Sequence, residues 1–308
     1  MARTIIFSEY GDPDVLRLVD VPEQEPGPGQ VRVSIRAAGV QPADIRMRSG
    51  AWRARMPATF PSRLGNEGAG VVEAVGPGVT AFAAGDEILG PAGGAYAESV
   101  IFEADQIVHK PAVIPWSEAG ALSASGQTAS TAIEDLRVSS GETFLIHAAA
   151  GGVGHLAVQL ARAAGARVIG TASEENHEFL RFLGAIPVAY GPGLADRVRA
   201  VAPDGVDAAL DGAGGDEALE SSIELVAERE RIGTIADQAG AARLGLRAIG
   251  TRRAAQRLKG LVDAYTGGKV KVSIWKEFPL ADAAAAHREI EKRHLRGKIV
   301  LIQPPPAG

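Results

Sequence analysis

Short apolar runs separated by glycine and proline turns fill the first 120 residues of the chain. Runs of this length that are bounded by turn residues are typical of strands. Strands are predicted at residues 4–7, 15–19, 31–38, 70–75, 87–89 and 95–102. We therefore expect a compact β-rich domain over residues 1–120.

After residue 120 the strand-like runs alternate with helical segments. Strands are predicted at residues 144–148, 168–171, 187–190, 206–210, 231–235 and 246–249. Alternation at this spacing predicts an α/β domain with a doubly wound parallel sheet over residues 121–265, closed by a helix at 255–265. A helix at 281–292 and a strand at 298–302 follow, and we expect the tail 266–308 to complete the first domain.

Composition narrows the possible partners and the compartment. The 308 residues exceed the roughly 100–200 of one domain, and 46% of them are hydrophobic. Lys and Arg number 32 against 37 Asp and Glu, without a basic block, so we expect no nucleic-acid or membrane partner. A secretory signal and an uninterrupted apolar stretch of about 18 residues are also missing, which favours the cytoplasm.

One turn carries the strongest functional signal, because an apolar strand-like run leads through a glycine turn into a helix at residues 143–154. Ala149, Gly151 and Gly154 take the three glycine places of the dinucleotide-binding pattern, so alanine replaces the first glycine. Gly154 would let the helix pack close to the strand, and the helix N-terminus favours an anion. The pyrophosphate would lie against the turn residues Ala150, Gly151, Gly152 and Val153.

Six ordered segments of the chain are similar to one known family. They are residues 38–44, 48–50, 65–76, 85–90, 148–154 and 297–301. The chain resembles the zinc-free quinone oxidoreductase (zeta-crystallin-like) branch of the medium-chain dehydrogenase/reductase superfamily. This resemblance implies a GroES-like catalytic domain, a Rossmann domain and a cofactor cleft at their junction.

The residues argue against a metal centre. The chain has no cysteine, which excludes disulfides, thiolate catalysis and Cys-ligated zinc. Asn66 stands where the zinc-dependent relatives have a ligand histidine, and Asp44 lies near the position of a ligand cysteine. Asp44 and Glu67 could hold a cation, but we favour structural hydrogen-bond acceptors, and we expect no metal.

Without a metal, hydride transfer needs an acceptor that is already electrophilic, such as a quinone or an alkene conjugated to a carbonyl. Gln41 and Arg46 stand where relatives often have asparagine and tyrosine, and they are the candidate catalytic residues. Gln41 could donate an amide hydrogen bond to the acceptor or to the nicotinamide ribose. Arg46 could bind an enolate or an acidic substrate, although an arginine solvated at the cleft rim is an equal alternative.

The end of the second Rossmann strand indicates the cofactor. Enzymes that use NAD usually place Asp or Glu there, whereas this chain has Thr171 and Ser173, whose hydroxyls can bind a 2′-phosphate. The resemblance implies a 2′-phosphate shell of Ser173, His177 and Tyr190, so we predict NADPH. The acidic residues at 174–175 argue the other way, unless they only stabilise a helix N-terminus.

The nicotinamide side of the site is predicted from the carboxyl ends of later strands, which line the ligand crevice of such sheets. Thr128 matches a family position beside nicotinamide. The strand-end candidates are Gly212, Ala213, Thr234 and Ile235, with ordinary strand-ending turns as the alternative. The sixth strand would form the sheet edge through which relatives make a homodimer.

Two alternative hypotheses for the function remain. The first is an enoyl-thioester reductase on the same scaffold, which would need a basic patch such as Arg46, Arg48, Arg53 and Arg55. The second is an NADPH-binding or structural protein without catalytic activity.

Overall fold

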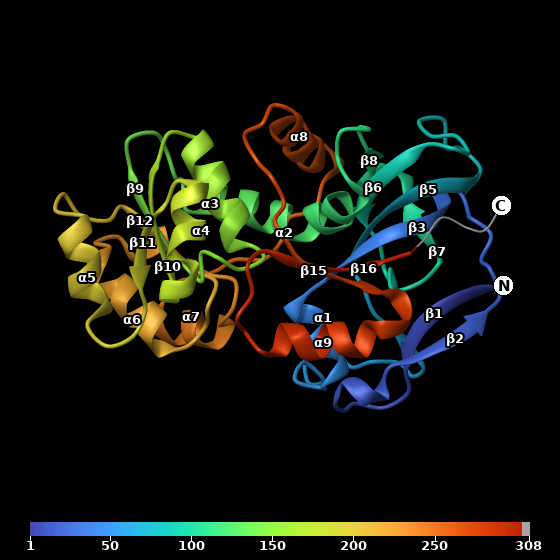
Figure 1. The fold of residues 1–308 in the computed structure, drawn as a ribbon, viewed down its shortest axis with the longest axis horizontal. Coiled ribbons are helices and arrows are strands. Elements are labelled where there is room, and N and C mark those ends of the chain that lie inside the picture. Colours follow the sequence, from blue (N-terminus) through green and yellow to red (C-terminus); the bar gives the residue numbers. More distant parts are fainter. Residues whose placement is uncertain (304–308) are drawn as a thin grey trace. The chain divides into compact units, whose positions relative to one another are not determined.

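The computed structural model describes residues 1–303, and its contacts divide them into two compact units (Figure 1). The first unit holds Met1–Ala124, Arg253–Thr266 and the described residues from Val272 onward. The second unit holds Ser125–Arg252 and Gly267–Lys271. The helix α8 (Ala255–Thr266) thus belongs to the first unit, where Tyr265 donates a hydrogen bond to Glu118 at 2.8 Å.

The first unit is built on two sheets. In the larger one the strand order is β15-β16-β3-β5-β6-β8, with β7 also paired to β3. Its strands are β3 (Gln30–Val40), β5 (Glu67–Val75), β6 (Glu87–Pro91), β7 (Ser99–Glu103), β8 (Val108–His109), β15 (Ile274–Pro279) and β16 (Lys298–Ile302). The smaller sheet has the order β2-β1-β4, formed by β1 (Ala2–Phe7), β2 (Arg17–Val21) and β4 (Ser62–Arg63). The C-terminal strand β16 pairs antiparallel with β3, so the end of the chain is part of this unit.

Alternating apolar residues of β3 build the core of the first unit. Val31, Val33 and Ile35 are buried and pack in one cluster with Phe102 of β7 and Ile299 of β16. The period of two follows from the pleat, which sends every second side chain to the same face. The helices α1 (Pro42–Arg48) and α9 (Ala283–Glu291) contact each other within this unit.

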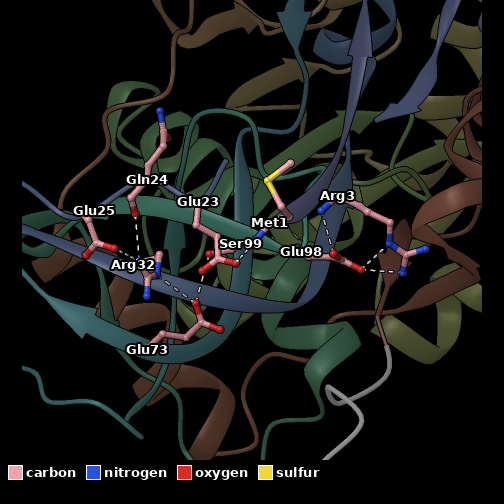
Figure 2. A network of polar contacts seen from close by, with 9 residues as sticks. All are labelled: Met1, Arg3, Glu23, Gln24, Glu25, Arg32, Glu73, Glu98 and Ser99. Carbon is pink, nitrogen blue, oxygen red and sulfur yellow. Dashed lines mark hydrogen bonds and ion pairs between the residues drawn. The ribbon is translucent and has the colours of Figure 1, made fainter. Parts of the chain in front are cut away.

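Ion pairs link neighbouring strands on the surface of the first unit (Figure 2). Arg32 of β3 pairs with Glu25 at 2.8 Å and with Glu73 of β5 at 3.3 Å. Arg3 of β1 pairs with Glu98, just before β7, at 2.6 Å. Ion pairs at the surface contribute little to stability, so the buried apolar residues are the main source of stability in this unit.

The second unit is a six-stranded parallel sheet with the order β11-β10-β9-β12-β13-β14. Its strands are β9 (Thr143–His147), β10 (Arg167–Ala172), β11 (Ile186–Ala189), β12 (Ala208–Asp211), β13 (Ile232–Thr234) and β14 (Arg247–Ala248). Strand order reverses beside β9, which is the arrangement of dinucleotide-binding folds. The predicted α/β class, with a β-rich domain and a doubly wound parallel sheet, is confirmed.

Helices connect the strands of the second unit and pack against its sheet (Figure 1). They are α3 (Gly154–Ala163), α4 (His177–Leu183), α5 (Leu194–Val201), α6 (Asp216–Leu225) and α7 (Gln238–Leu244). The C-terminal part of α2 (Trp116–Asp135) precedes β9 in the chain. Leu145, Ile169 and Ile232, one from each of three strands, are buried in a single cluster. Within residues 1–303, no helix has both the length and the apolar content needed to cross a membrane.

Candidate functional site

The glycine turn lies between β9 and α3, at the point where the strand order reverses. Ala148 has a left-handed backbone with φ of 53°, which turns the chain sharply out of the strand. The amide of Gly151 donates to the carbonyl of Ala148 at 3.0 Å, and this bond closes the turn. A Cβ on Gly154 would overlap that same carbonyl oxygen, so only glycine allows the helix to start so close to the strand.

Ala149 stands where the dinucleotide-binding pattern has its first glycine, and it is fully buried. Its amide donates to the carbonyl of Thr171 on β10 at 3.0 Å. A Cβ added to Gly170, on the same strand, would lie 2.7 Å from the Ala149 Cβ. The extra methyl group is therefore accommodated because the neighbouring strand has no side chain opposite it, a role of Gly170 that the sequence analysis did not assign.

The turn leaves backbone amides in a position to bind an anion. Ala150 is buried, and Gly151, Gly152 and Val153 are partly exposed. Among the described residues, no side chain caps the N-terminus of α3, which runs for 10 residues. Uncapped amides at a helix N-terminus, with the helix dipole behind them, fit a phosphate group.

His147, the last residue of β9, is buried behind this turn. The Ser222 hydroxyl donates its one proton to the carbonyl of Ala218 at 2.7 Å, so His147 Nε2 must donate to that hydroxyl at 2.9 Å. His147 Nδ1 then accepts from the Thr171 hydroxyl at 3.4 Å. Burial lowers the pKa of His147 to about 4, against the opposing charge of Asp211, so the imidazole is neutral near pH 7.

Thr171 was predicted to contact the 2′-phosphate, but the structure turns its side chain inward. The residue is buried, and its hydroxyl proton is directed at His147. The hydroxyl therefore orders the strand ends under the turn rather than facing a ligand.

Ser173, His177 and Tyr190 lie around the ends of β10 and β11. Ala172 pairs with Ala189 in the sheet, so Ser173 and Tyr190 leave neighbouring strands at the same level. Tyr190 is 53% exposed, and the Ser173 hydroxyl accepts a hydrogen bond from Asn176 at 3.1 Å. The Nε2 atom of His177 is buried and has no hydrogen-bond partner among residues 1–303.

The nearby acidic pair, Glu174 and Glu175, is exposed on a short 3-10 turn that runs into α4. Acidic side chains at such a position stabilise the helix dipole. A hydroxyl, a phenol and an unpartnered imidazole nitrogen thus fit the 2′-phosphate that the sequence analysis expected here.

A buried carboxylate organises the ends of β12 and β13. Asp211 accepts hydrogen bonds from the amides of Ala213 at 2.8 Å and Gly214 at 2.9 Å, and from the Thr234 hydroxyl at 2.6 Å. The Thr234 hydroxyl in turn accepts from the amides of Ala236 at 3.0 Å and of Asp237. Thr234, a predicted nicotinamide contact, is therefore a buried link between two strand ends.

The other predicted nicotinamide contacts lie at more accessible points. Gly212 and Ile235 are partly exposed, and Ala213 is exposed. The amide of Ile235 donates to the carbonyl of Asp211 at 3.0 Å, so the Asp211 backbone and side chain together hold both strand ends. Thr128 of α2 is partly exposed, and its hydroxyl lies 2.6 Å from the hydroxyl of Thr251.

Gln41, in the first unit, is the N-cap residue of α1 and is 7% exposed. Its Nε2 donates a hydrogen bond to Oε1 of Glu67. Glu67 is fully buried, and the same Oε1 atom accepts from Lys298 Nζ at 3.1 Å. Its Oε2 atom accepts from the amide of Ala124 at 2.6 Å.

Asp44 is the second buried carboxylate of this unit. It accepts hydrogen bonds from the amide of Gln41 at 2.8 Å, the Tyr96 hydroxyl at 2.9 Å and the amide of Gly65 at 3.2 Å. Burial raises the pKa of Asp44 to about 6, although these three bonds oppose the rise. Both acidic residues weighed as cation ligands thus have their oxygens occupied by donors. Among residues 1–303, no group of three or more potential ligand side chains could hold a metal.

The arginines of the expected basic patch differ in their exposure and in their contacts. Arg46 is partly exposed, with its guanidinium 5.5 Å from the centre of the Trp52 ring, and Arg55 lies 5.2 Å from the same ring. Arg48, in contrast, is buried and pairs with Glu291 at 2.5 Å. Arg48 therefore supports the interior of the unit and is not part of a surface patch.

His287 of α9 lies next to this buried arginine. Its Nδ1 is 3.5 Å from Arg48 Nη1, and its Nε2 is 3.4 Å from the Tyr96 hydroxyl. Burial, with a smaller contribution from Arg48, lowers the pKa of His287 to about 3. The contacts of His287 with Arg48 and Tyr96 could not be predicted from the sequence, because the spacing of these residues along the chain gives no motif.

Comparisons with known proteins agree with this architecture. Residues 27–112 match the family model of the alcohol dehydrogenase GroES-like domain, and residues 183–301 match the model of zinc-binding dehydrogenases. A quinone oxidoreductase of Pseudomonas aeruginosa is 34% identical, over 98% of this chain and 100% of that protein. A 2-haloacrylate reductase of a Burkholderia species is also 34% identical, over 98% and 99% of the two chains. The solved structure of Escherichia coli quinone oxidoreductase complexed with NADPH superposes with a TM-score of 0.87 at 28% identity, over 98% and 100% of the two chains.

Proposed function

The chain belongs to the quinone oxidoreductase branch of the medium-chain dehydrogenase/reductase superfamily, and on that premise we propose that it transfers hydride from NADPH to a quinone or an α,β-unsaturated carbonyl compound. The cofactor supplies the hydride when bound. The tasks of the protein are to hold it, to orient the acceptor and to exclude water.

One observation carries the choice of cofactor. At the end of β10, where enzymes specific for NAD place a carboxylate, this chain has Ser173, with the unpartnered Nε2 of His177 close by in sequence. Tyr190 leaves the adjacent strand at the same level. Together they offer hydrogen-bond donors to a 2′-phosphate, as the complex of the E. coli relative with NADPH also suggests.

The pyrophosphate would lie at the uncapped N-terminus of α3, against the residues of the turn. Its contacts would be Ala150, Gly151, Gly152 and Val153. The nicotinamide would lie near Thr128, Gly212, Ala213 and Ile235, while Thr234 would act through its link to Asp211.

Gln41 is the proposed hydrogen-bond donor to the acceptor carbonyl. An amide carries two Nε2 hydrogens, and one of them goes to Glu67. The other can stabilise negative charge as it develops on the acceptor oxygen during hydride transfer. We expect Gln41 to contribute on the order of a hundredfold to a thousandfold in kcat, the range for one such donor.

A second acceptor class is favoured by Arg46, which is partly exposed beside Trp52. A guanidinium there could bind the carboxylate of a small α,β-unsaturated acid. The relative that reduces 2-haloacrylate, an acid of this class, supports the idea. The enoyl-thioester reading is less favoured, since Arg48 is buried and cannot help to bind a carrier.

The exposed strand β14 ends the parallel sheet, and both of its residues, Arg247 and Ala248, are exposed. An unpaired edge is available for pairing with the same edge of a second copy. We propose a homodimer formed in this way, which the molar mass from light scattering would test.

The decisive experiment is NADPH oxidation by the pure protein with quinones, simple enones, 2-haloacrylate and enoyl thioesters in parallel, with NADH as the matched cofactor control. Turnover of quinones or enones with NADPH supports the proposal, and turnover of the acid alone supports the second class. Exclusive turnover of thioesters, a preference for NADH, or cofactor binding without any turnover would contradict it.

A further inference from the structure

A buried ion pair crosses the main sheet of the first unit beneath Gln41. Lys298 of β16 and Glu67 of β5 have side chains that are 2% and 0% exposed, and their charged atoms lie 3.1 Å apart. Strand β3 runs between these two strands. The pair can form because β3 has Gly39 at this point, where a Cβ would overlap Oε1 of Glu67.

The ion pair determines which hydrogen bonds Glu67 makes with its neighbours. Oε1 accepts hydrogen bonds from Lys298 and Gln41, and Oε2 accepts from the amide of Ala124 at 2.6 Å. An ionised carboxylate can only accept hydrogen bonds. The carboxamide of Gln41 must therefore turn its NH2 group, and not its carbonyl oxygen, toward Glu67.

Stability alone does not explain such a pair. Moving two charges into a protein interior costs several kcal/mol each, and well-packed apolar residues are often as stabilising. The pair does, however, select one of two orientations of a side chain that has a donor at one end and an acceptor at the other.

We propose that Lys298 is a positioning residue, which holds Oε1 of Glu67 in place and thereby fixes the orientation of the Gln41 carboxamide. The inference deepens the proposed function and rests on it, because it assigns Gln41 as a donor to the acceptor. Without Lys298, Oε1 of Glu67 loses one of its two donors, and the carboxyl group is no longer held at this place. The Gln41 amide, which donates to the same atom, then moves with it, and the donor offered to the acceptor is displaced.

The kinetic test uses Lys298→Met and Lys298→Arg. In Lys298→Met we expect kcat to fall by on the order of tenfold to a hundredfold, the scale of a misplaced catalytic group. The dissociation constant for NADPH should stay unchanged, because the turn that binds the cofactor belongs to the second unit. Lys298→Arg keeps the charge and should recover most of the lost activity.

Lys110→Met is the matched control. Lys110 is also a buried lysine of the first unit, and it pairs with Glu87 at 2.8 Å, but it does not contact Gln41 or Glu67. Its replacement removes an ion pair whose acidic partner, Glu87, is 43% exposed, and it should leave kcat unchanged. Equal losses of kcat in both lysine variants would point to general destabilisation and overturn the proposal.

A second measurement works without any substrate, so it distinguishes failure of the inference from failure of the proposed function. Heteronuclear NMR of isotope-labelled protein reports the side-chain NH2 signals of Gln41, identified by their loss in Gln41→Glu. We expect these signals to shift in Lys298→Met, to return in Lys298→Arg and to stay unchanged in Lys110→Met. Unchanged Gln41 signals in folded Lys298→Met would overturn the proposal even if the enzyme reduces quinones.

If Lys298→Met fails to fold, Glu67→Gln combined with Lys298→Met replaces it, because this double variant leaves no buried unpaired charge. The proposal predicts shifted Gln41 signals and the same loss of kcat in the double variant. Native signals together with native kcat would overturn it.

Discussion

Ala149 and Gly170 pack against each other where β9 and β10 end, and a Cβ on Gly170 would lie 2.7 Å from the Ala149 Cβ. The dinucleotide turn of this chain therefore depends on two positions at once. The first glycine of the motif is lost, and a glycine on the next strand makes room for the methyl group that replaces it. A motif search along the sequence would score the first position as a defect, although the local packing is complete.

This pairing predicts an unusual double-mutant result. Gly170→Ala should lower the free energy of unfolding by about 1–3 kcal/mol, the usual cost of overpacking a core. Ala149→Gly removes the opposing methyl group, so the double variant should recover part of that loss. Denaturant unfolding of the two single variants and the double variant measures the coupling. Gly250→Ala, at a glycine with open space around it, is the control. Strictly additive losses would contradict the pairing.

The parts of the fold that could be predicted are those in which local sequence decides the structure. The central strands of the second unit are short apolar runs between turns, and they appear within a few residues of their predicted places. Strand β15 was not predicted, because Lys276 and Glu277 interrupt its apolar pattern and it lies at a sheet edge. The helix α8 was predicted as part of the second domain, whereas its contacts place it in the first unit. An amphipathic pattern does not indicate which element covers the apolar face.

In the candidate site too, features set by consecutive residues could be predicted, and features set by residues from distant elements could not. The glycine turn could be identified because its residues are consecutive. A Cβ on Gly154 would indeed overlap the carbonyl oxygen of Ala148. The inward orientation of Thr171 could not be predicted, because it depends on His147 and Ser222, which come from other elements. The ion pair between Lys298 and Glu67 joins residues that are 231 positions apart, so no local sequence pattern could predict it.

The buried His147 predicts a loss of stability in acid. Its pKa is about 4 in the folded protein against 6.5 for the free side chain, so between these values only the unfolded chain binds the proton. The free energy of unfolding should therefore fall as the pH decreases from 6.5 to 4, by about 3 kcal/mol for this group. His147→Gln keeps a donor for Ser222 and removes the titration. Denaturant unfolding at several pH values should show a shallower decline for this variant.

Two other buried groups contribute to the pH dependence that remains in that variant. His287, with a pKa of about 3 in the folded state, adds a decline of the same sign. Asp44 has a pKa raised from 3.8 to about 6, so its folded form binds the proton first and stability rises as the pH falls through that window. A decline in His147→Gln as steep as in the wild type would show that His147 is not neutral when buried.

Cofactor preference should respond to one residue at the end of β10. Ser173→Asp places a carboxylate where the proposed 2′-phosphate would lie, while the ribose diol of NADH can donate to it. Affinity for NADPH should fall by about tenfold or more, the worth of a charge-assisted hydrogen bond, and affinity for NADH should hold or improve. Direct binding titrations with both cofactors measure the change, and Ser173→Ala serves as the uncharged control. Equal losses for both cofactors would mean that the 2′-phosphate lies elsewhere.

Activity should not depend on a metal. Asn66 stands at the position of a ligand histidine, and Asp44 accepts three hydrogen bonds from protein groups. Incubation with a strong chelator should leave kcat unchanged, and elemental analysis of the active protein should find zinc far below one atom per chain. Stoichiometric zinc that leaves together with activity would refute this expectation.

Asp211 should govern both stability and cofactor binding from a fully buried position. Asp211→Asn keeps the shape, but its NH2 group must face either the backbone amides of the turn or the Thr234 hydroxyl, which already accepts two amides. We expect a loss of about 1–3 kcal/mol in the free energy of unfolding, the cost of an unsatisfied buried group, and weaker NADPH binding. Asp207→Asn is the control, because Asp207 accepts from the amide of Thr143 at 2.7 Å, at the start of β9 and away from the turn. Asp207 is exposed, and an asparagine oxygen can still accept from that amide, so only Asp211→Asn should lose stability and, in isothermal titration, cofactor affinity. Equal affinities in the two variants would place the nicotinamide away from the ends of β12 and β13.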